Sequence, residues 1–405
     1  MSHNTQVVAD PKSAVQLSVP ATNMSHAAKE KPLRAADLSY SRSSTPQPVP
    51  SETSVLASEQ SICTDHMITA TWKYGVGWSS PELKPYGPLS LQPTASCLHY
   101  ATECFEGLKA YRGYDGKLRV FRIDHNVARL RTSASRISLP LFEPEEVKKL
   151  IIRLLSIDAA RWLPEGQTGN FLYVRPTIIG TSAQLGVQAP KEAMLFIVLA
   201  FMPRLDLPPG GLRLYSSPED AVRAWVGGFG YAKIGANYGP SVMVLNEAAA
   251  RGYHQVLWLY GKDGECTEAG GCNFFIVWIR KDGVKELITA PLDDKTILDG
   301  VTRRSCLELA KERLGQEIQV TERKFTITEV MNAATEGRLL ESFAAGTAYF
   351  ISAVSRIHHR GKDIDVSIGQ SGKGGEITTA IKTWLSEIMY GETEHEWATV
   401  VPTEA

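Results

Sequence analysis

One lysine stands out because glycines surround it on both sides. Lys233 is the only lysine between Arg223 and Ser241, a stretch that reads RAWVGGFGYAKIGANYGPS. Glycines let the backbone and a flat ring approach each other closely, and a lysine amine withdrawn from water readily forms a Schiff base. We therefore hypothesise that Lys233 binds pyridoxal 5'-phosphate (PLP) covalently.

A PLP site also needs an acid facing the ring nitrogen and a hydroxyl donor to the phenolic oxygen. Glu268 precedes an apolar strand in the small-residue stretch Thr267–Asn273, and its carboxylate would keep the ring nitrogen protonated. The alternative is a glutamate exposed at a hairpin tip. Tyr238 is a candidate for the hydroxyl donor, and its alternative is a core tyrosine bonded to a backbone carbonyl.

Two turns are candidates for the phosphate site. Residues 298–302 (LDGVT) run straight into a predicted helix, whose first N–H groups and positive dipole end favour an anion. Residues 345–348 (AGTA) form a small-residue turn between two predicted strands. Arg129 lies on a predicted helix and is a third candidate, although a solvated helix face would also explain it.

Signals for other cofactors are weaker. Gly227-Gly-Phe-Gly230 lacks the Gly-x-Gly-x-x-Gly spacing of a dinucleotide site, and Gly372-Lys373 lacks the context of a phosphate-binding loop. The pair His358-His359 has no further ligand at zinc-site spacing. A Gly-x-Ser-x-Gly nucleophile motif is absent.

Composition indicates an ordinary globular enzyme. The 405 residues include 43% apolar and 21% charged residues, with 43 Lys and Arg against 44 Asp and Glu. This balance gives no net field for nucleic acid or a membrane surface, and no apolar run approaches the roughly 18 residues of a membrane span. The six cysteines are scattered, which favours reduced thiols inside a cell.

The chain length fits two α+β domains and an extension. We expect a disordered extension over 1–61, which is rich in Ser, Pro and Ala, and a small N-terminal domain over 62–202. A Pro- and Gly-rich linker is expected over 203–221, and a large cofactor-binding domain over 222–405. Acidic residues interleave with basic ones in the extension, so the cytoplasm is favoured over the mitochondrion, the alternative.

Periodicity and turn residues predict the elements that position these side chains. Helices are expected over 147–155, from about Pro240 to Gly252, over 302–314, after the capping box at Thr326, and along 377–388. Strands are expected over 118–122, 171–175, 193–200, 255–260, 273–280, 286–290, 339–343 and 349–354.

In their order and spacing, several motifs resemble the branched-chain amino acid aminotransferases of eukaryotes, from about Asp65 to the end of the chain. The motifs are Leu98-His-Tyr100, Phe105-Glu-Gly-Leu-Lys-Ala110, Tyr173-Val-Arg-Pro176, Arg223-Ala-Trp-Val-Gly227, Lys233 through Tyr238-Gly-Pro240, Gln255-Val-Leu-Trp-Leu259, Gly346-Thr-Ala348 and His395-Glu-Trp397.

The resemblance implies the two-domain fold-type IV (D-amino acid aminotransferase-like) architecture, with PLP at the domain interface of a homodimer. It also implies ping-pong transfer of the amino group between branched-chain L-amino acids (Leu, Ile, Val) and 2-oxoglutarate. Lys233 would be the Schiff-base lysine that also moves the Cα proton.

The resemblance assigns the remaining site residues as well. Tyr238 would contact the phenolic oxygen and Glu268 the ring nitrogen. The phosphate would lie on Arg129, Thr347 and the backbone of Val301 and Thr302. The substrate α-carboxylate would be held by Tyr173, Thr347 and Ala348, and the second carboxylate of glutamate by Arg175. Tyr100 and Phe105 would line the aliphatic pocket, with Tyr100 reaching the partner subunit's site.

Residues 201–206 (FMPRLD) depart from the family's pattern, which leaves the amino-acid preference open. One alternative is a related aminotransferase specialised for an unusual amino acid. A second is a PLP lyase of the same fold that acts on aminodeoxychorismate, and a third is a catalytically silent binding protein.

Overall fold

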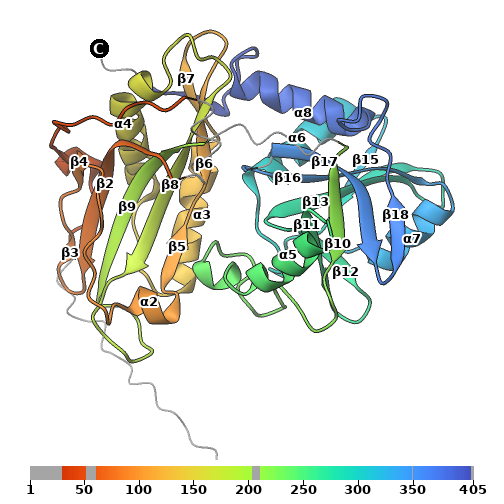
Figure 1. The fold of residues 1–405 in the computed structure, drawn as a ribbon, viewed down its shortest axis with the longest axis horizontal. Helices are drawn as coiled ribbons and strands as arrows, with labels where there is room; N and C mark the ends of the chain where they lie inside the picture. Colours follow the sequence, from red (N-terminus) through yellow and green to blue (C-terminus); the bar gives the residue numbers. More distant parts are fainter. Residues whose placement is uncertain (1–29, 52–60, 203–209, 349, 403–405) are drawn as a thin grey trace, which may run out of the picture.

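The structure, a computed structural model, describes residues 30–51, 61–202, 210–348 and 350–402. These residues form two lobes, each built around one large sheet (Figure 1). The expected two-domain α+β architecture is therefore confirmed.

The N-terminal lobe contains a mainly antiparallel sheet with the strand order β1-β4-β2-β9-β8-β6-β7-β19; β3 pairs with β2, and β5 with β8. Helices α3 and α4 pack together beside it. The strands are β1 (Ser39–Tyr40), β2 (Cys63–Lys73), β3 (Gly77–Trp78), β4 (Glu82–Pro85), β5 (Glu103–Phe105), β6 (Leu108–Arg112), β7 (Leu118–Phe121), β8 (Phe171–Gly180), β9 (Glu192–Phe201) and β19 (Ala398–Val400), and the helices are η1 (Ala35–Asp37), α2 (Ser96–Tyr100), α3 (Ile123–Arg136) and α4 (Pro144–Trp162).

Helix α4 follows the sequence pattern closely. Pro144 occupies its first turn, where the missing N–H costs nothing. Its apolar stripe, including Leu150 and Leu154, is fully buried in the main core of the lobe. Burial of each such leucine stabilises the fold by about 1.5–3 kcal/mol.

The C-terminal lobe has the strand order β12-β11-β10-β17-β16-β13-β14-β15, and β12 also pairs with β13. Helices α6 and α8 cover one face, while α7 packs against the other. The strands are β10 (Leu212–Ser216), β11 (Gln255–Tyr260), β12 (Glu265–Ala269), β13 (Cys272–Ile279), β14 (Lys285–Thr289), β15 (Gln319–Glu322), β16 (Leu339–Gly346), β17 (Phe350–His359) and β18 (Lys362–Asp365), and the helices are η2 (Gly235–Asn237), α5 (Ser241–Ala250), α6 (Val301–Leu314), α7 (Ile327–Thr335) and α8 (Glu376–Met389).

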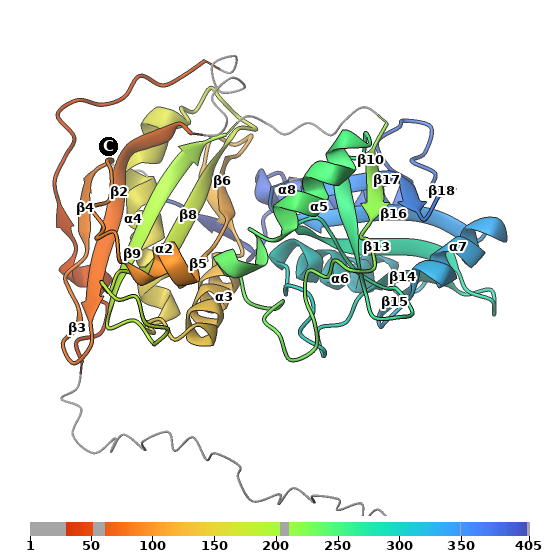
Figure 2. The ribbon, with the colours of Figure 1, turned by 60° about the horizontal axis from the view of Figure 1, so that its bottom comes forward.

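One hydrophobic cluster joins the two lobes. Tyr111, Phe121 and Phe171 of the N-terminal sheet pack with residues of α6 and α8, including Val301 and Ile388. The segment between β10 and α5 also reaches the N-terminal lobe in both views (Figures 1 and 2). The lobes therefore share packed surfaces on either side of the residues expected to do chemistry.

The prediction of disorder over 1–61 is wrong for residues 30–51, which pack along the N-terminal lobe. Leu33 is buried in its core, and the backbone N–H groups of Ser43 and Gln47 donate to His66 and Asp65. A polar composition hid this segment, because its order comes from contacts with distant residues, several of them made by the backbone, rather than from an apolar pattern of its own. Residues 1–29 and 52–60 lie outside the described residues.

Two of the expected domain boundaries also differ. Leu212–Ser216, placed in the linker, forms β10 of the C-terminal sheet, with Leu212 and Leu214 buried and Arg213 exposed. The chain end does not stay in the C-terminal domain, since β19 pairs with β7 of the N-terminal sheet. Both strands are short and depend on distant partners, so local pattern could not identify them.

The predicted helices and strands are present, but their ends differ from the predicted ones by up to seven residues, most at the end of α4. Residue 349, the first of the strand predicted over 349–354, lies outside the described residues. The capping box at Thr326 forms as expected, with reciprocal bonds to Glu329. Strand β12 was not predicted, and it changes the setting of Glu268, which lies within it.

No helix in the described residues combines the length and apolar character that a membrane crossing requires. Within the same residues, no group of three or more His, Cys, Asp or Glu side chains could hold a metal ion.

Candidate active site

The backbone of Lys233 is fixed by the N-terminal lobe, although the lysine belongs to the second half of the chain. Its N–H donates to Ser133 Oγ of α3 at 2.8 Å, and its carbonyl accepts from the Phe105 N–H at 3.1 Å. Gly235 has no room for a side chain, because a Cβ there would lie 2.0 Å from Glu103 Oε1. The glycines around Lys233 therefore allow the lysine loop to dock against β5.

The Lys233 amine lies between two aromatic rings. Its Nζ is 3.0 Å from the Tyr238 hydroxyl and 4.8 Å from the centroid of the Phe105 ring. The one-turn helix η2 reverses the chain so that Tyr238 faces the lysine five residues earlier. Tyr238 therefore lies where a hydroxyl donor beside the lysine is needed.

Glu268 is buried rather than exposed at a hairpin tip, with 2% of its surface accessible. Its Oε1 accepts bonds from the Leu298 N–H at 3.1 Å and Asn273 Nδ2 at 3.3 Å. Burial raises the pKa of this carboxyl, and the nearby Arg223 cation opposes the rise.

The second oxygen of Glu268 retains hydrogen-bonding capacity. Arg223 Nη2 approaches Oε2 to 2.5 Å as an ion pair, but no donor in the described residues makes an aligned hydrogen bond to it. The Arg223 cation therefore lies close enough to stabilise the negative charge of Glu268. Because its N–H groups are not aligned with Oε2, a lone pair of that oxygen can still accept a hydrogen bond from another donor. A buried acceptor of this kind suits a protonated ring nitrogen.

Arg129 lies in a buried ion pair instead of on a solvated helix face. Its Nε and Nη2 donate to Glu106 at 2.6 and 2.8 Å, and its Nη1 donates to the Asp299 carbonyl at 2.8 Å. Burial alone would lower the pKa of Arg129, but the Glu106 carboxylate outweighs it and the pKa is raised. The guanidinium therefore stays charged while it connects α3 to the loop before α6.

The two phosphate candidates from the sequence meet in space. Val301 and Thr302, at the start of α6, line one small cavity together with Thr347 of the β16–β17 turn. A Cβ at Gly300 would lie 2.1 Å from Asn273 Oδ1, so glycine is required where the loop enters the helix. The cavity is about 20 Å³, the size of a water molecule, and it must widen to take a phosphate.

Among the substrate candidates, Phe105 contacts Lys233, and Arg175 connects Phe105 to Tyr173. The Arg175 guanidinium lies 4.8 Å from the Phe105 ring centroid and 5.2 Å from that of Tyr173. Arg175 Nε is buried without a hydrogen-bond partner in the described residues. An unsatisfied cation beside aromatic rings suits a carboxylate ligand.

Tyr100 lies apart from this cluster. Its hydroxyl donates to the Leu185 carbonyl in the β8–β9 loop, and within the described residues no hydrogen bond or ring contact connects it to Lys233. Leu98 of the same helix, α2, and Val187 of the β8–β9 loop are exposed apolar side chains.

The family described as Amino-transferase class IV matches residues 103–356. The chain belongs to the class IV aminotransferases. The matched range contains Lys233, Tyr238, Glu268 and Arg129.

Relatives of known name are similar over most of this aminotransferase. The cytosolic branched-chain-amino-acid aminotransferase of Saccharomyces cerevisiae is 47% identical over 84% of this chain and 90% of its own length. The mitochondrial enzyme of the same yeast is 44% identical over 91% and 94%, and the cytosolic enzyme of Mus musculus is 43% identical over 84% and 86%.

Solved structures agree in fold. The branched-chain aminotransferase of Thermoproteus uzoniensis with norvaline is 27% identical, with a TM-score of 0.63 over 82% of this chain and 99% of that one. A second branched-chain amino acid aminotransferase, from T.th. and complexed with N-(5'-phosphopyridoxyl)-L-glutamate, is 27% identical, with a TM-score of 0.61 over 82% and 98%.

Sequence reasoning gave no role to several residues of the aminotransferase site. Glu106, Asn126 and Ser133 position Arg129 and Lys233, while Arg223 and Asn273 hold Glu268. A signal was available for Glu106, because its carboxylate stands between the apolar pair Cys104-Phe105 and the strand β6.

Lys109 is a second buried lysine near the site. Only 8% of it is accessible, its Nζ donates to the Ala348 carbonyl at 3.2 Å, and it lies 3.9 Å from the Phe171 ring centroid. Burial lowers its pKa to about 8. Lys109 therefore brings an amine that changes charge near neutral pH to the turn formed by Thr347 and Ala348.

Proposed function

We propose that this class IV aminotransferase uses PLP to move the amino group of leucine, isoleucine or valine to 2-oxoglutarate. The observation that carries the proposal is the buried Oε2 of Glu268, which lacks an aligned donor, in the same site as the Lys233 amine. The names of the relatives support the branched-chain substrates, and the pyridoxal-derived group in a similar solved structure supports the cofactor.

PLP, when bound, takes up the amino group and withdraws the electron pair left at the substrate Cα. Lys233 would bond the cofactor's aldehyde carbon through Nζ and, once the substrate amine displaces it, move the Cα proton. Glu268 Oε2 would hold the proton on the ring nitrogen, and the Tyr238 hydroxyl would donate to the phenolic oxygen.

Other residues would hold the phosphate and the substrate. Arg129, the first N–H groups of α6 at Val301 and Thr302, and Thr347 would bind the phosphate. Tyr173 and the Thr347–Ala348 turn would hold the α-carboxylate. Phe105 would face the aliphatic side chain, and Arg175 at its edge would take the second carboxylate of 2-oxoglutarate, so one pocket serves both substrates.

The test is a screen in which single amino acids are added to the PLP form of the enzyme, and the half-reaction is monitored by the absorbance of the cofactor. We expect conversion to the pyridoxamine form by leucine, isoleucine and valine, and reconversion by 2-oxoglutarate. Lys233→Ala should abolish both steps, since it removes the amine proposed to move the Cα proton. Conversion by an unusual amino acid but by none of the three would instead favour a specialised aminotransferase.

We also infer a homodimer, because Tyr100 lies apart from Lys233 beside exposed apolar side chains such as Leu98 and Val187. Light scattering should give twice the chain mass.

The cytosolic and mitochondrial names of the relatives leave both compartments open, and the mixed charges of residues 1–61 favour the cytoplasm. Cell fractionation tests that assignment.

A further inference from the structure

A surface hollow is lined by residues of α3 other than those that contact the candidate active site, and by Tyr231 of the lysine loop. It measures about 650 Å³, within the range of small-molecule sites. We call it the α3 hollow. Its lining includes Arg131, Thr132, Ser135, Arg136, Leu141 and Tyr231.

The charge of the α3 hollow is positive. None of its lining residues, all within the described parts of the chain, is acidic. The nearest carboxylate paired with Arg131 is Glu143 at 4.0 Å, and that side chain is 74% exposed, so water screens the pair strongly. Arg136 contacts the Phe229 ring at 5.5 Å and forms no ion pair within the described residues.

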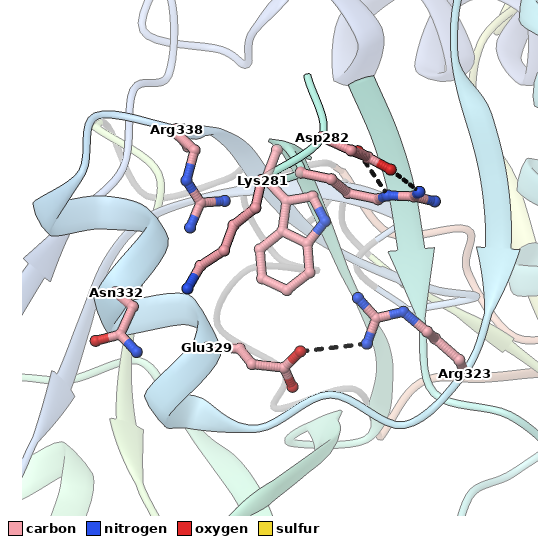
Figure 3. A pocket seen from close by; sticks show the side chains of 8 residues that line it. Lys281, Asp282, Arg323, Glu329, Asn332 and Arg338 are labelled. Carbon is pink, nitrogen blue, oxygen red and sulfur yellow. Dashed lines mark hydrogen bonds and ion pairs between the residues drawn. The ribbon is translucent and has the colours of Figure 1, made fainter. Parts of the chain in front are cut away.

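In a second surface hollow, carboxylates pair with the arginines. Arg280, Arg323 and Arg338 surround it together with Lys281 (Figure 3). Each arginine there pairs with a carboxylate, at Asp282, Glu329 and Glu336 respectively. The two hollows therefore differ in available charge, because Arg136 forms no ion pair within the described residues and Arg131 has only the long, exposed pair with Glu143, whereas each arginine of the second hollow has a closer pair.

The rest of the α3 hollow selects among anions. Leu141, 48% exposed, offers an apolar surface beside the arginines, and Ser135 and Tyr231 offer hydroxyl donors. An amino acid would bring its ammonium group close to two arginines, and no lining side chain carries a carboxylate to offset that repulsion. We propose that the α3 hollow binds a short aliphatic carboxylate without an amino group, of the 2-oxo acid class, as an effector separate from the substrate.

A short chain connection and one hydrogen bond link the α3 hollow to the lysine. Tyr231 is two residues before Lys233, and Ser133, on the helix that lines the hollow, bonds the Lys233 N–H at 2.8 Å. Binding of the oxo acid in the α3 hollow is therefore expected to change the transamination rate without competing with the amino acid. This effect on the rate rests on the proposed function, whereas the binding does not depend on it.

Calorimetric titration of the PLP-loaded protein with 4-methyl-2-oxopentanoate tests the binding. We expect one binding event in the α3 hollow, and a second event in the active-site cleft that follows from the proposed function. The double variant Arg131→Ala, Arg136→Ala should weaken one event by about tenfold or more, while Lys281→Ala of the second hollow, the matched control, should keep both. The substituted side chains are exposed, so the melting temperature should not change.

Three results would overturn the proposal. One is a double variant that retains every binding event with unchanged affinity, and another is a wild-type protein with a single event that the double variant does not weaken. The third is inorganic phosphate, or leucine added to the pyridoxamine form, binding to the α3 hollow as tightly as the oxo acid. Because titration requires no turnover, a failure of leucine transamination would count against the proposed function alone.

Discussion

At the scale of single residues, burial decides what each candidate can do. Glu268 is almost inaccessible and keeps one oxygen without an aligned donor, whereas a solvated glutamate would be paired with water. Lys233 is held between Tyr238 and Phe105. Burial of Glu268 and the aromatic neighbours of Lys233 therefore limit what these two side chains can bind and which protons they can exchange.

Replacing Glu268 with Gln tests the ring-nitrogen assignment. The amide cannot hold a proton on the ring nitrogen, so we expect PLP to bind but the leucine half-reaction to slow by about a hundredfold or more. Single-turnover absorbance measures this rate. Glu265→Gln, the same change at a partly exposed position of the same strand, is the control, and wild-type rates for Glu268→Gln would contradict the assignment.

Replacing Arg175 with Ala tests the dual-substrate pocket. Loss of a charged donor to the second carboxylate should reduce kcat/KM for 2-oxoglutarate by about tenfold to a hundredfold, with leucine little affected. Steady-state kinetics with each substrate provides the measurement, with Arg213→Ala at an exposed site as the control. Equal losses for both substrates would indicate a structural role instead.

Lys109 gives a pH prediction. Its folded pKa of about 8 is below the ordinary 10.5, so the unfolded chain binds more protons between these values and this group makes stability rise with pH in that window. The shift corresponds to about 3 kcal/mol at most.

Lys109→Met should remove that rise. The variant should gain most over the wild type below pH 8, and the gain should shrink toward pH 10.5, as measured by urea unfolding at several pH values. Lys281→Met, at an exposed lysine, should show no such trend. A gain for Lys109→Met that is constant with pH would mean that Lys109 is not buried as a cation.

At the scale of elements, residues 30–51 depend on anchors provided by the globular part. Asp65 accepts from the Gln47 N–H at 2.6 Å and from Trp162 Nε1 at 3.1 Å, and it also pairs with Arg161. Asp65 is 7% exposed. Its removal would leave several donors without an acceptor.

We therefore expect Asp65→Ala to lower the unfolding free energy by about 2–4 kcal/mol and to make residues 41–51 sensitive to limited proteolysis. Glu82→Ala, which removes an exposed ion pair with Lys84, should cost about 1 kcal/mol or less. Unchanged proteolysis of Asp65→Ala would show that apolar contacts such as Leu33 suffice to hold the segment.

At the scale of the whole molecule, the chain end fastens the two lobes together. After α8 of the C-terminal lobe, the chain returns to the N-terminal sheet as β19. On the way Trp397 packs on the Arg122 guanidinium at 4.0 Å and on the Phe121 ring at 5.9 Å. Because the expected cofactor residues come from both lobes, this fastening matters for the site.

Trp397→Ala should loosen the lobes and weaken PLP binding, and should lower the unfolding free energy by about 2 kcal/mol, somewhat below the cost of a fully buried tryptophan. Calorimetry and cofactor titration measure these effects. Tyr74→Ala, at an exposed aromatic residue of the N-terminal lobe, is the matched control. A wild-type transition together with wild-type cofactor affinity would rule out the role of Trp397.

The sequence by itself determined the elements with strong local signals and the candidate residues. The apolar stripe of α4, the capping box at Thr326 and the glycines around Lys233 are local features, so periodicity and turn chemistry predicted them. The motifs that carry the family resemblance are likewise short stretches of sequence. In each case the physical cause lies within a few residues of its effect.

Only the tertiary structure decided how these pieces meet. It buried Glu268 in β12, paired Arg129 with Glu106, and brought the turns at Val301 and Thr347 into one cavity. It also placed β10, β19 and residues 30–51, whose order depends on hydrogen bonds with residues far along the chain. Burial and charge pairing are properties of such distant contacts, and no local pattern encodes them.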